Sequence, residues 1–119
     1  MPKTRFNYEI DEYGLRLWQL TNMNYLGETV KIQGEINCRG KYKRKEFRFI
    51  IAFIPDAIRP PQPIVNMEYR LVILFVHIKN CQPYIDMLRY EKPIYGYVDT
   101  ENPSNCCITT SGEEIGEEE

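Results

Sequence analysis

The stretch from Tyr69 to Lys79 limits the possible folds more than any other part of the chain. Between Leu71 and Ile78 every residue except His77 is apolar, and most are β-branched or aromatic. A strand with one face in water alternates apolar and polar residues, so this run predicts a strand that is covered on both faces. It is too short to span a bilayer as a helix, which needs about 20 apolar residues. We therefore expect it to be the central strand of the core.

The size and composition of the chain are those of one folded domain, which we expect to span residues 1–119. Its 119 residues can bury a core without disulfides or metal ions, and 43% of them are hydrophobic. The formal net charge of −2 gives no overall attraction to nucleic acid or to a membrane. Residues 111–119 include five glutamates, and we expect them to form an acidic, flexible tail.

The cysteines and the N-terminus predict a reducing environment. The first residues lack the apolar segment of a secretory signal. Two of the four cysteines are adjacent in sequence, and adjacent cysteines rarely bridge each other. We therefore expect reduced, mostly buried thiols in a soluble, cytoplasmic protein that does not bind a membrane. The four are Cys38, Cys81, Cys106 and Cys107.

Alternating apolar and polar residues predict seven strands and one helix. Turn-forming residues at 11–14 join the first two strands into an N-terminal hairpin, and a second turn is expected at 38–41. The helix covers about 81–91, where one apolar stripe repeats at helical spacing, and ends before Pro93. The expected strands lie at about 6–10, 15–20, 28–37, 42–54, 71–78, 94–98 and 106–110.

These elements predict a mainly β fold, with α+β as the alternative. We expect a small antiparallel barrel or a curved sheet of about seven strands, with the helix between the fifth and sixth strands. From residue 28 onward, the order strand, strand, strand, helix, strand, strand is similar to that of an OB-fold barrel. A closed barrel and an open sheet need the same alternation, so the pattern leaves both possible.

The segment from Arg39 to Arg48 carries the strongest local charge in the sequence. Its ten residues include six bases and one acid, a local charge of +5 in a chain whose total is −2. On a projecting hairpin such cations can contact phosphate groups, and a tyrosine can stack on a base. The alternative is a solvated hairpin whose charges prevent edge-to-edge aggregation. The candidate binding residues of this basic hairpin are Arg39, Lys41, Tyr42, Lys43, Arg44, Lys45 and Arg48.

Aromatic residues at the surface are the candidates for contact with a protein partner, because aromatic side chains often carry the binding energy of an interface. We place Arg16 and Trp18 together on the outer face of the strand at 15–20, where they can begin a contact surface. Trp18 is therefore added to the candidate binding residues. The aromatic residues expected at the surface are Tyr13, Trp18, Tyr25 and Tyr42.

The sequence carries no signature of a catalytic or metal site. His77 is the only histidine, and on a core strand it is more consistent with a buried structural residue than with acid–base catalysis. The cysteines form no C-x-x-C pair, and the acidic loop at 99–105 lacks the ligand spacing of a calcium site. We predict no catalytic residue, no metal and no cofactor, and favour a non-enzyme.

Three functions remain open, in this order of preference. The first is a small non-catalytic interaction module that binds a protein partner or associates with itself. The second is a binder of single-stranded nucleic acid or another polyanion through residues 39–48. The third is a small-ligand pocket protein or an enzyme near His77.

Overall fold

The two longest apolar stretches of the sequence form neighbouring parallel strands in the computed structural model, which describes residues 4–110. These strands are β3 (Lys45–Ile54) and β5 (Leu71–His77), paired from Arg48 opposite Leu71 to Ile54 opposite His77. The first five residues of β5 are all buried, which confirms that both of its faces are covered. The strand lies second from one end of the sheet, however, and not at its centre.

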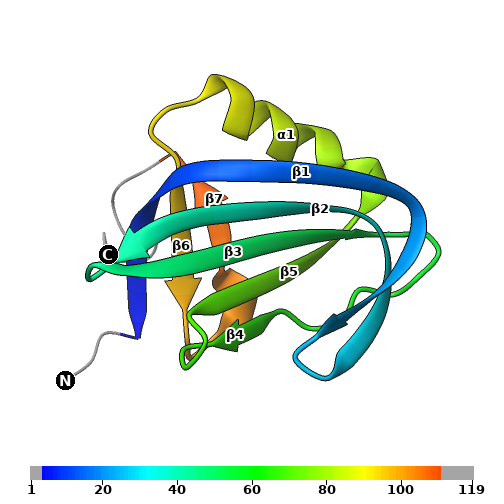
Figure 1. Cartoon of the computed structure of the whole chain (residues 1–119), viewed down its shortest axis with the longest axis horizontal. Helices are drawn as coiled ribbons and strands as arrows, with labels where there is room; N and C mark the ends of the chain where they lie inside the picture. The colour runs from blue at the N-terminus through cyan, green and yellow to red at the C-terminus, as the bar shows by residue number, and fades with distance from the viewer. Residues whose placement is uncertain (1–3, 111–119) are drawn as a thin grey trace.

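All seven strands belong to one mixed sheet, in the order β4-β5-β3-β2-β1-β6-β7 (Figure 1). Every neighbouring pair except β3 and β5 is antiparallel. The mainly β fold, the total of seven strands and the helix after the fifth strand are therefore confirmed, although two expected strands form one and one further strand was not expected. The other elements are β1 (Arg5–Tyr25), β2 (Glu28–Tyr42), β4 (Ile64–Asn66), η1 (Ile78–Asn80), α1 (Cys81–Tyr90), β6 (Tyr95–Asp99), η2 (Pro103–Asn105) and β7 (Cys107–Thr109).

The sheet is curved and open. Among residues 4–110 its two end strands, β4 and β7, pair only with β5 and β6 and not with each other, so of the two expected alternatives the curved sheet forms and the closed barrel does not. Strand β4 was not expected, because it lies in the proline-rich connection after β3. None of the helices in this part of the chain has the length and apolarity that a membrane crossing needs. The predicted acidic tail at 111–119 lies outside the described residues.

The predicted N-terminal hairpin is wrong, because residues 5–25 form the single strand β1. Its first part, Arg5–Glu9, pairs with β6, and the rest pairs with β2. The register with β2 shifts between Ile10 and Glu12, which leaves Asp11 as an extra residue. Such a β-bulge bends a strand without ending it, so the turn-forming residues here produce a bend and not a reversal. Figure 1 shows β1 arching along the length of the molecule.

The turn predicted at 38–41 is also misplaced. Cys38 and Gly40 continue the inward alternation of β2, and the chain reverses only at Lys43 and Arg44. Both turn residues have positive φ, 53° and 71°, as a two-residue turn of type I′ requires. The basic segment is therefore a hairpin, as expected, with its tip four residues later than the centre of the predicted turn.

Side chains on the two faces of β3 belong to two separate core clusters. Its odd-numbered residues from Phe47 to Phe53 face the first core cluster, beneath α1, and its even-numbered residues from Ile50 to Ile54 face the second. The first consists of Phe6, Tyr8, Ile36, Cys38, Phe47, Phe49, Ile51, Phe53, Val72, Leu74, Leu88, Ile94, Val98, Cys106 and Ile108. The second consists of Tyr25, Val30, Ile32, Ile50, Ala52, Ile54, Leu71, Ile73 and Phe75.

The far end of the β1–β2 hairpin covers the second core cluster. A second register shift, between Leu17 and Thr21, bends β1 there. The ring of Tyr25 then packs edge-on against Phe75 at 5.7 Å, and its hydroxyl donates a 2.6 Å hydrogen bond to Glu35. Tyr25 is 5% exposed, so the expectation that it lies at the surface is wrong.

Gly40 is a sensitive test of the close approach between β1 and β2. A Cβ atom at residue 40 would overlap the carbonyl oxygen of Glu9, a backbone atom that cannot move without disturbing β1. We expect Gly40→Ala to lower the free energy of unfolding by about 3 kcal/mol, measured by urea denaturation at low micromolar protein. Gly14→Ala is the matched control, because nothing lies within 4 Å of its Cβ position. Equal stability of the two variants would contradict the observed approach of β1 to β2.

Candidate functional site

The middle of β1 has a free edge. Strand β6 pairs with β1 only over Arg5–Glu9, and the last backbone bond on this side is donated by the Ile10 N–H to the Ile94 carbonyl oxygen at 2.8 Å. From Asp11 onward no strand within residues 4–110 lies on this edge, while β2 occupies the other. We define the edge segment as Glu12–Leu17, the six residues that pair with β2 without interruption between the two bulges.

Apolar side chains of the edge segment are exposed although they point to the side of the first core cluster. Tyr13, Leu15 and Leu17 stand opposite Cys38, Ile36 and Gly34 of β2, yet they are 40%, 39% and 63% exposed. Glu12, Gly14 and Arg16 project from the other face and are exposed as well. Because glycine has no side chain, the exposure of Gly14 is exposure of the backbone itself. The edge segment is therefore open to a partner along its length.

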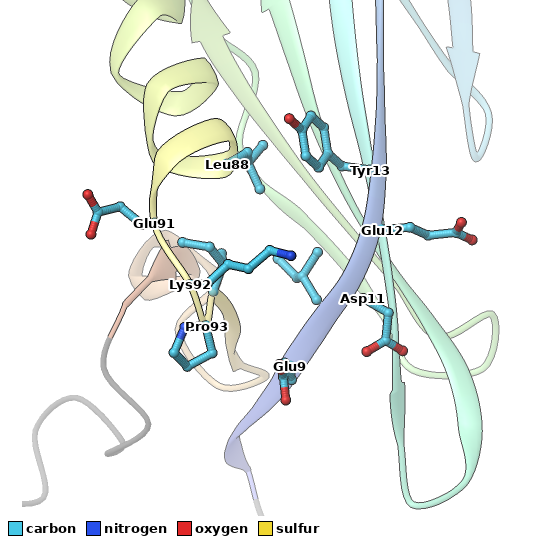
Figure 2. Close-up of a pocket in the computed structure, with 10 residues that line it drawn as sticks. Glu9, Asp11, Glu12, Tyr13, Leu88, Glu91, Lys92 and Pro93 are labelled. Atoms are coloured by element: carbon cyan, nitrogen blue, oxygen red, sulfur yellow. The ribbon is translucent and has the colours of Figure 1, made fainter.

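A groove of about 390 Å³ continues this edge toward α1. It lies between β1 and the chain that leaves α1, and Ile10, Leu88 and Ile94 contribute apolar surface to it. In Figure 2 the ring of Tyr13 extends toward Leu88, and Lys92 reaches into the gap from the opposite side. The groove shows that the end of α1 does not pack tightly against the free edge of β1.

Charged groups surround the groove but point mostly away from it. Figure 2 shows the side chains of Asp11 and Glu12 on the side of β1 that faces away from α1. Glu12 forms an ion pair with Arg39, with 3.3 Å between carboxylate and guanidinium, and both side chains are largely exposed. The pair is worth little to stability because water screens it. It does place one acid of the edge segment beside the basic hairpin.

The predicted binding residues of the basic hairpin do come together. Arg39 and Arg48 are directly opposite each other on β2 and β3, so their side chains share the face away from α1. Lys41 joins them on that face, and Lys43 and Arg44 form the tip, followed by Lys45. Among the described residues, Arg39 is the one cation of this hairpin that forms an ion pair. The hairpin therefore presents several cations without acidic partners from the rest of the described structure.

Tyr42 and Trp18, two of the aromatic residues proposed to contact a partner, pack against other side chains of the same chain. The ring of Tyr42 stacks on Phe6 with 3.9 Å between centroids, and the Lys43 ammonium lies 5.4 Å from the Tyr42 centroid. Trp18 is half-buried against the second core cluster, so it is not fully exposed beside Arg16 as expected. Tyr13, by contrast, is exposed as predicted and belongs to the edge segment.

His77 holds the proline-rich connection in place. Its Nε2 lies 2.8 Å from the carbonyl oxygen of Ile58, within hydrogen-bonding distance, and the residue is half-buried at the end of β5. A ring nitrogen that is engaged with the backbone is consistent with a structural histidine. Within residues 4–110 the hydrogen bonds of His77 include no carboxylate or nucleophile that would make it a catalytic base.

The four cysteines are free thiols, as expected. Burial raises the pKa of Cys38 to about 12. Burial is also the main cause that raises the pKa of Cys106 to about 11. Neither thiol therefore forms the reactive thiolate at neutral pH. No group of three or more His, Cys, Asp or Glu residues suited to a metal ion occurs within residues 4–110.

The acidic loop after β6 is organised by Asp99. This buried carboxylate accepts hydrogen bonds from the backbone N–H groups of Glu101 (3.0 Å) and Asn102 (2.9 Å) and from Nδ2 of Asn105 (3.2 Å). Burial by itself would raise the pKa of Asp99, but these bonds and the charge of Arg5 outweigh it and hold the pKa below its ordinary value. The loop is a turn, as predicted, and its central acid is engaged in holding the turn together.

Comparisons of the chain with protein-family models, with curated proteins and with solved structures return no match. The edge segment and the basic hairpin are therefore the two features of the molecule that indicate a function. Sequence reasoning missed the edge segment, although its signal is visible as the alternation of Tyr13, Leu15 and Leu17 with polar or small residues.

The role of Asp99 predicts how stability depends on pH. Because its pKa is lower in the folded state than in the unfolded state, Asp99 stabilises the fold above the unfolded value of about 3.9. That stabilisation disappears as the pH falls through the lower, folded value. We expect Asp99→Asn to lower the free energy of unfolding by about 1–2 kcal/mol at pH 7. The difference should shrink below about pH 4, as urea denaturation at several pH values can show. A difference that stays constant down to about pH 2.5 would contradict the charge as its cause.

Proposed function

We propose that this chain is a non-catalytic interaction module that binds a protein partner by adding a strand to the edge segment of β1. The observation that carries the proposal is a regular, exposed strand edge whose Tyr13, Leu15 and Leu17 are also exposed. Unpaired N–H and C=O groups on such an edge supply affinity to an incoming strand, and alternate side chains supply specificity. The free backbone edge and the exposed alternate side chains occur in the same six residues.

The contrast with the other edges of the sheet supports this function. The sheet ends in β4 and β7, which are only three residues long, and short edge strands are one way in which proteins prevent unwanted pairing. The edge segment is twice that length and carries no lysine or proline. Two edges of the sheet are thus protected from pairing, whereas the edge segment is open. This difference is best explained if the open edge receives a strand from a partner.

A lysine within the edge segment tests this function. Leu15→Lys places a charge in the apolar row, which opposes strand addition. We expect the immobilised wild-type chain to capture a partner protein, or a second copy of itself, from an extract of its source cells. Capture by Leu15→Lys should fall about tenfold or more, a loss of roughly 1.4 kcal/mol or more in binding free energy. The captured protein is quantified by mass spectrometry.

Met67→Lys is the matched control for this experiment. Met67 is 42% exposed, close to the 39% of Leu15, but lies in the turn between β4 and β5, away from the free edge. It should capture the partner as the wild-type chain does. Circular dichroism establishes that both variants are folded. A partner that binds Leu15→Lys and the wild-type chain equally would show that the edge segment is not the binding surface.

A second candidate function is binding of single-stranded nucleic acid or another polyanion by the basic hairpin. The observation that favours it is that Arg39, Lys41 and Arg48 share one face of the hairpin, and of these three only Arg39 forms an ion pair among residues 4–110. Lys41, Lys43 and Arg44, which form no ion pair among residues 4–110, extend the same positive surface to the hairpin tip. Tyr42 contributes less to this function because its ring is stacked on Phe6.

Fluorescence anisotropy of a labelled mixed-sequence oligonucleotide tests the second candidate. If the hairpin binds polyanions, affinity should fall at least about tenfold when salt rises from roughly 50 to 200 mM, because each phosphate contact releases counterions. Binding should be lost in Lys43→Glu with Arg44→Glu. Lys31→Glu with Arg59→Glu changes the net charge equally at exposed residues outside the hairpin and should retain binding. Absence of binding by the wild-type chain at low salt would eliminate this function.

A further inference from the structure

We infer that the strand which adds to the edge segment is the edge segment of a second copy, paired antiparallel about a two-fold axis at Gly14. This inference rests on the proposed function and names its partner. An isologous contact of this kind uses the same surface on both copies. Each pair of opposite residues therefore occurs twice in the dimer. Such a contact requires an edge segment that is complementary to itself.

The faces of the strand restrict the possible alignments. A two-fold axis perpendicular to the sheet keeps the face with Tyr13, Leu15 and Leu17 on the same side in both copies. Residues directly opposite each other in an antiparallel pair also share a face. The axis must therefore pass midway between the two copies of one residue. If it passed between two neighbouring residues, the apolar side chains of one copy would lie opposite residues whose side chains point to the other face.

Charge selects one of these alignments. With the axis at Gly14, Glu12 of one copy lies opposite Arg16 of the other, and this pair occurs twice. On the opposite face the same alignment places Tyr13 against Leu15 of the second copy, also twice. An axis at Leu15 would place Arg16 opposite Gly14, and an axis at Tyr13 would place Arg16 opposite Ile10. Among these three alignments, only the one at Gly14 sets Glu12 and Arg16 opposite each other. Glu12 already pairs with Arg39 of its own chain and would gain a second cation.

Gly14 also suits a residue on the axis. The two copies of this residue would face each other directly, and a glycine brings no side chain to that crowded point. It is exposed, with nothing within 4 Å of the position where a Cβ atom would lie. Arg16 is exposed too and forms no ion pair among residues 4–110, so its guanidinium is available to the second copy.

The experiment measures mass in solution by light scattering and by sedimentation from about 1 to 500 μM, a range that spans the affinities of weak and moderate dimers. The wild-type chain should reach twice the 14.2 kDa of one chain. Glu12→Arg places two arginines opposite each other in both pairs, and Arg16→Glu places two glutamates opposite each other. Each variant alone should dimerise at least about tenfold more weakly, because two attractive pairs become repulsive. Glu68→Arg, a charge reversal at an exposed residue outside β1, should dimerise as the wild-type chain does.

Mixing the two single variants tests the alignment itself. In a mixed dimer the two arginines of the Glu12→Arg chain lie opposite the two glutamates of the Arg16→Glu chain, so both pairs become attractive again. An equimolar mixture should therefore regain dimers that neither variant forms alone. Damage to the fold of either variant would not be repaired by mixing, and thermal unfolding of each variant measures such damage separately.

Each other result has a distinct meaning. A wild-type chain that stays monomeric up to the highest concentration overturns self-pairing, while the edge remains the proposed binding surface if Leu15→Lys still loses capture of another protein. Dimers that are insensitive to both charge reversals show that the copies associate through a different surface. Dimers that both reversals weaken, but that mixing does not restore, overturn the alignment at Gly14.

Discussion

The need to cover both faces of β3 and β5 shapes the rest of this structure. From Ile50 to Ile54 in β3, and from Leu71 to Phe75 in β5, every side chain is buried, whichever face it occupies. A chain of 119 residues has few elements with which to cover two faces. It uses α1 with β6 and β7 on one face, and the curled end of the β1–β2 hairpin on the other. Two small cores thus replace the single core of a closed barrel.

Strand β1 has to contribute to both of these covers, which explains its length and its free edge. Phe6 and Tyr8 at its beginning belong to the first core cluster, where they pair with β6, and Tyr25 at its end belongs to the second. The residues between them span the distance from one cover to the other. They pair with β2 on one side, but β6 is only five residues long and cannot follow them on the other. The exposed edge segment is therefore a geometric consequence of how the two cores are closed.

Patterns that depend on neighbouring residues were predicted well from the sequence. The doubly buried run, the alternation from Val30 to Ile36 and the helix before Pro93 are encoded within a few residues, because burial and helix periodicity are local signals. The interpretation failed at 11–14 and 38–41, where turn-forming residues remain extended. Asp11 is accommodated in a bulge and Gly40 lies beneath the backbone of Glu9, and both outcomes depend on strands that pair from far away in the chain. The free edge could not be predicted for the same reason, since it depends on where β6 stops pairing.

The two bulges that flank the edge segment also limit what the free edge can do. A long, flat and apolar edge recruits strands without limit, which leads to aggregation. Here the register shifts at Ile10/Glu12 and Leu17/Thr21 leave six regular residues, about 20 Å of strand, between two bends. An added strand longer than this would have to follow both bends. When the added strand is the same segment of a second copy, each chain uses its one regular free edge to bind the other. The assembly then closes at two chains, so an edge that would otherwise be a hazard becomes a self-limiting interface.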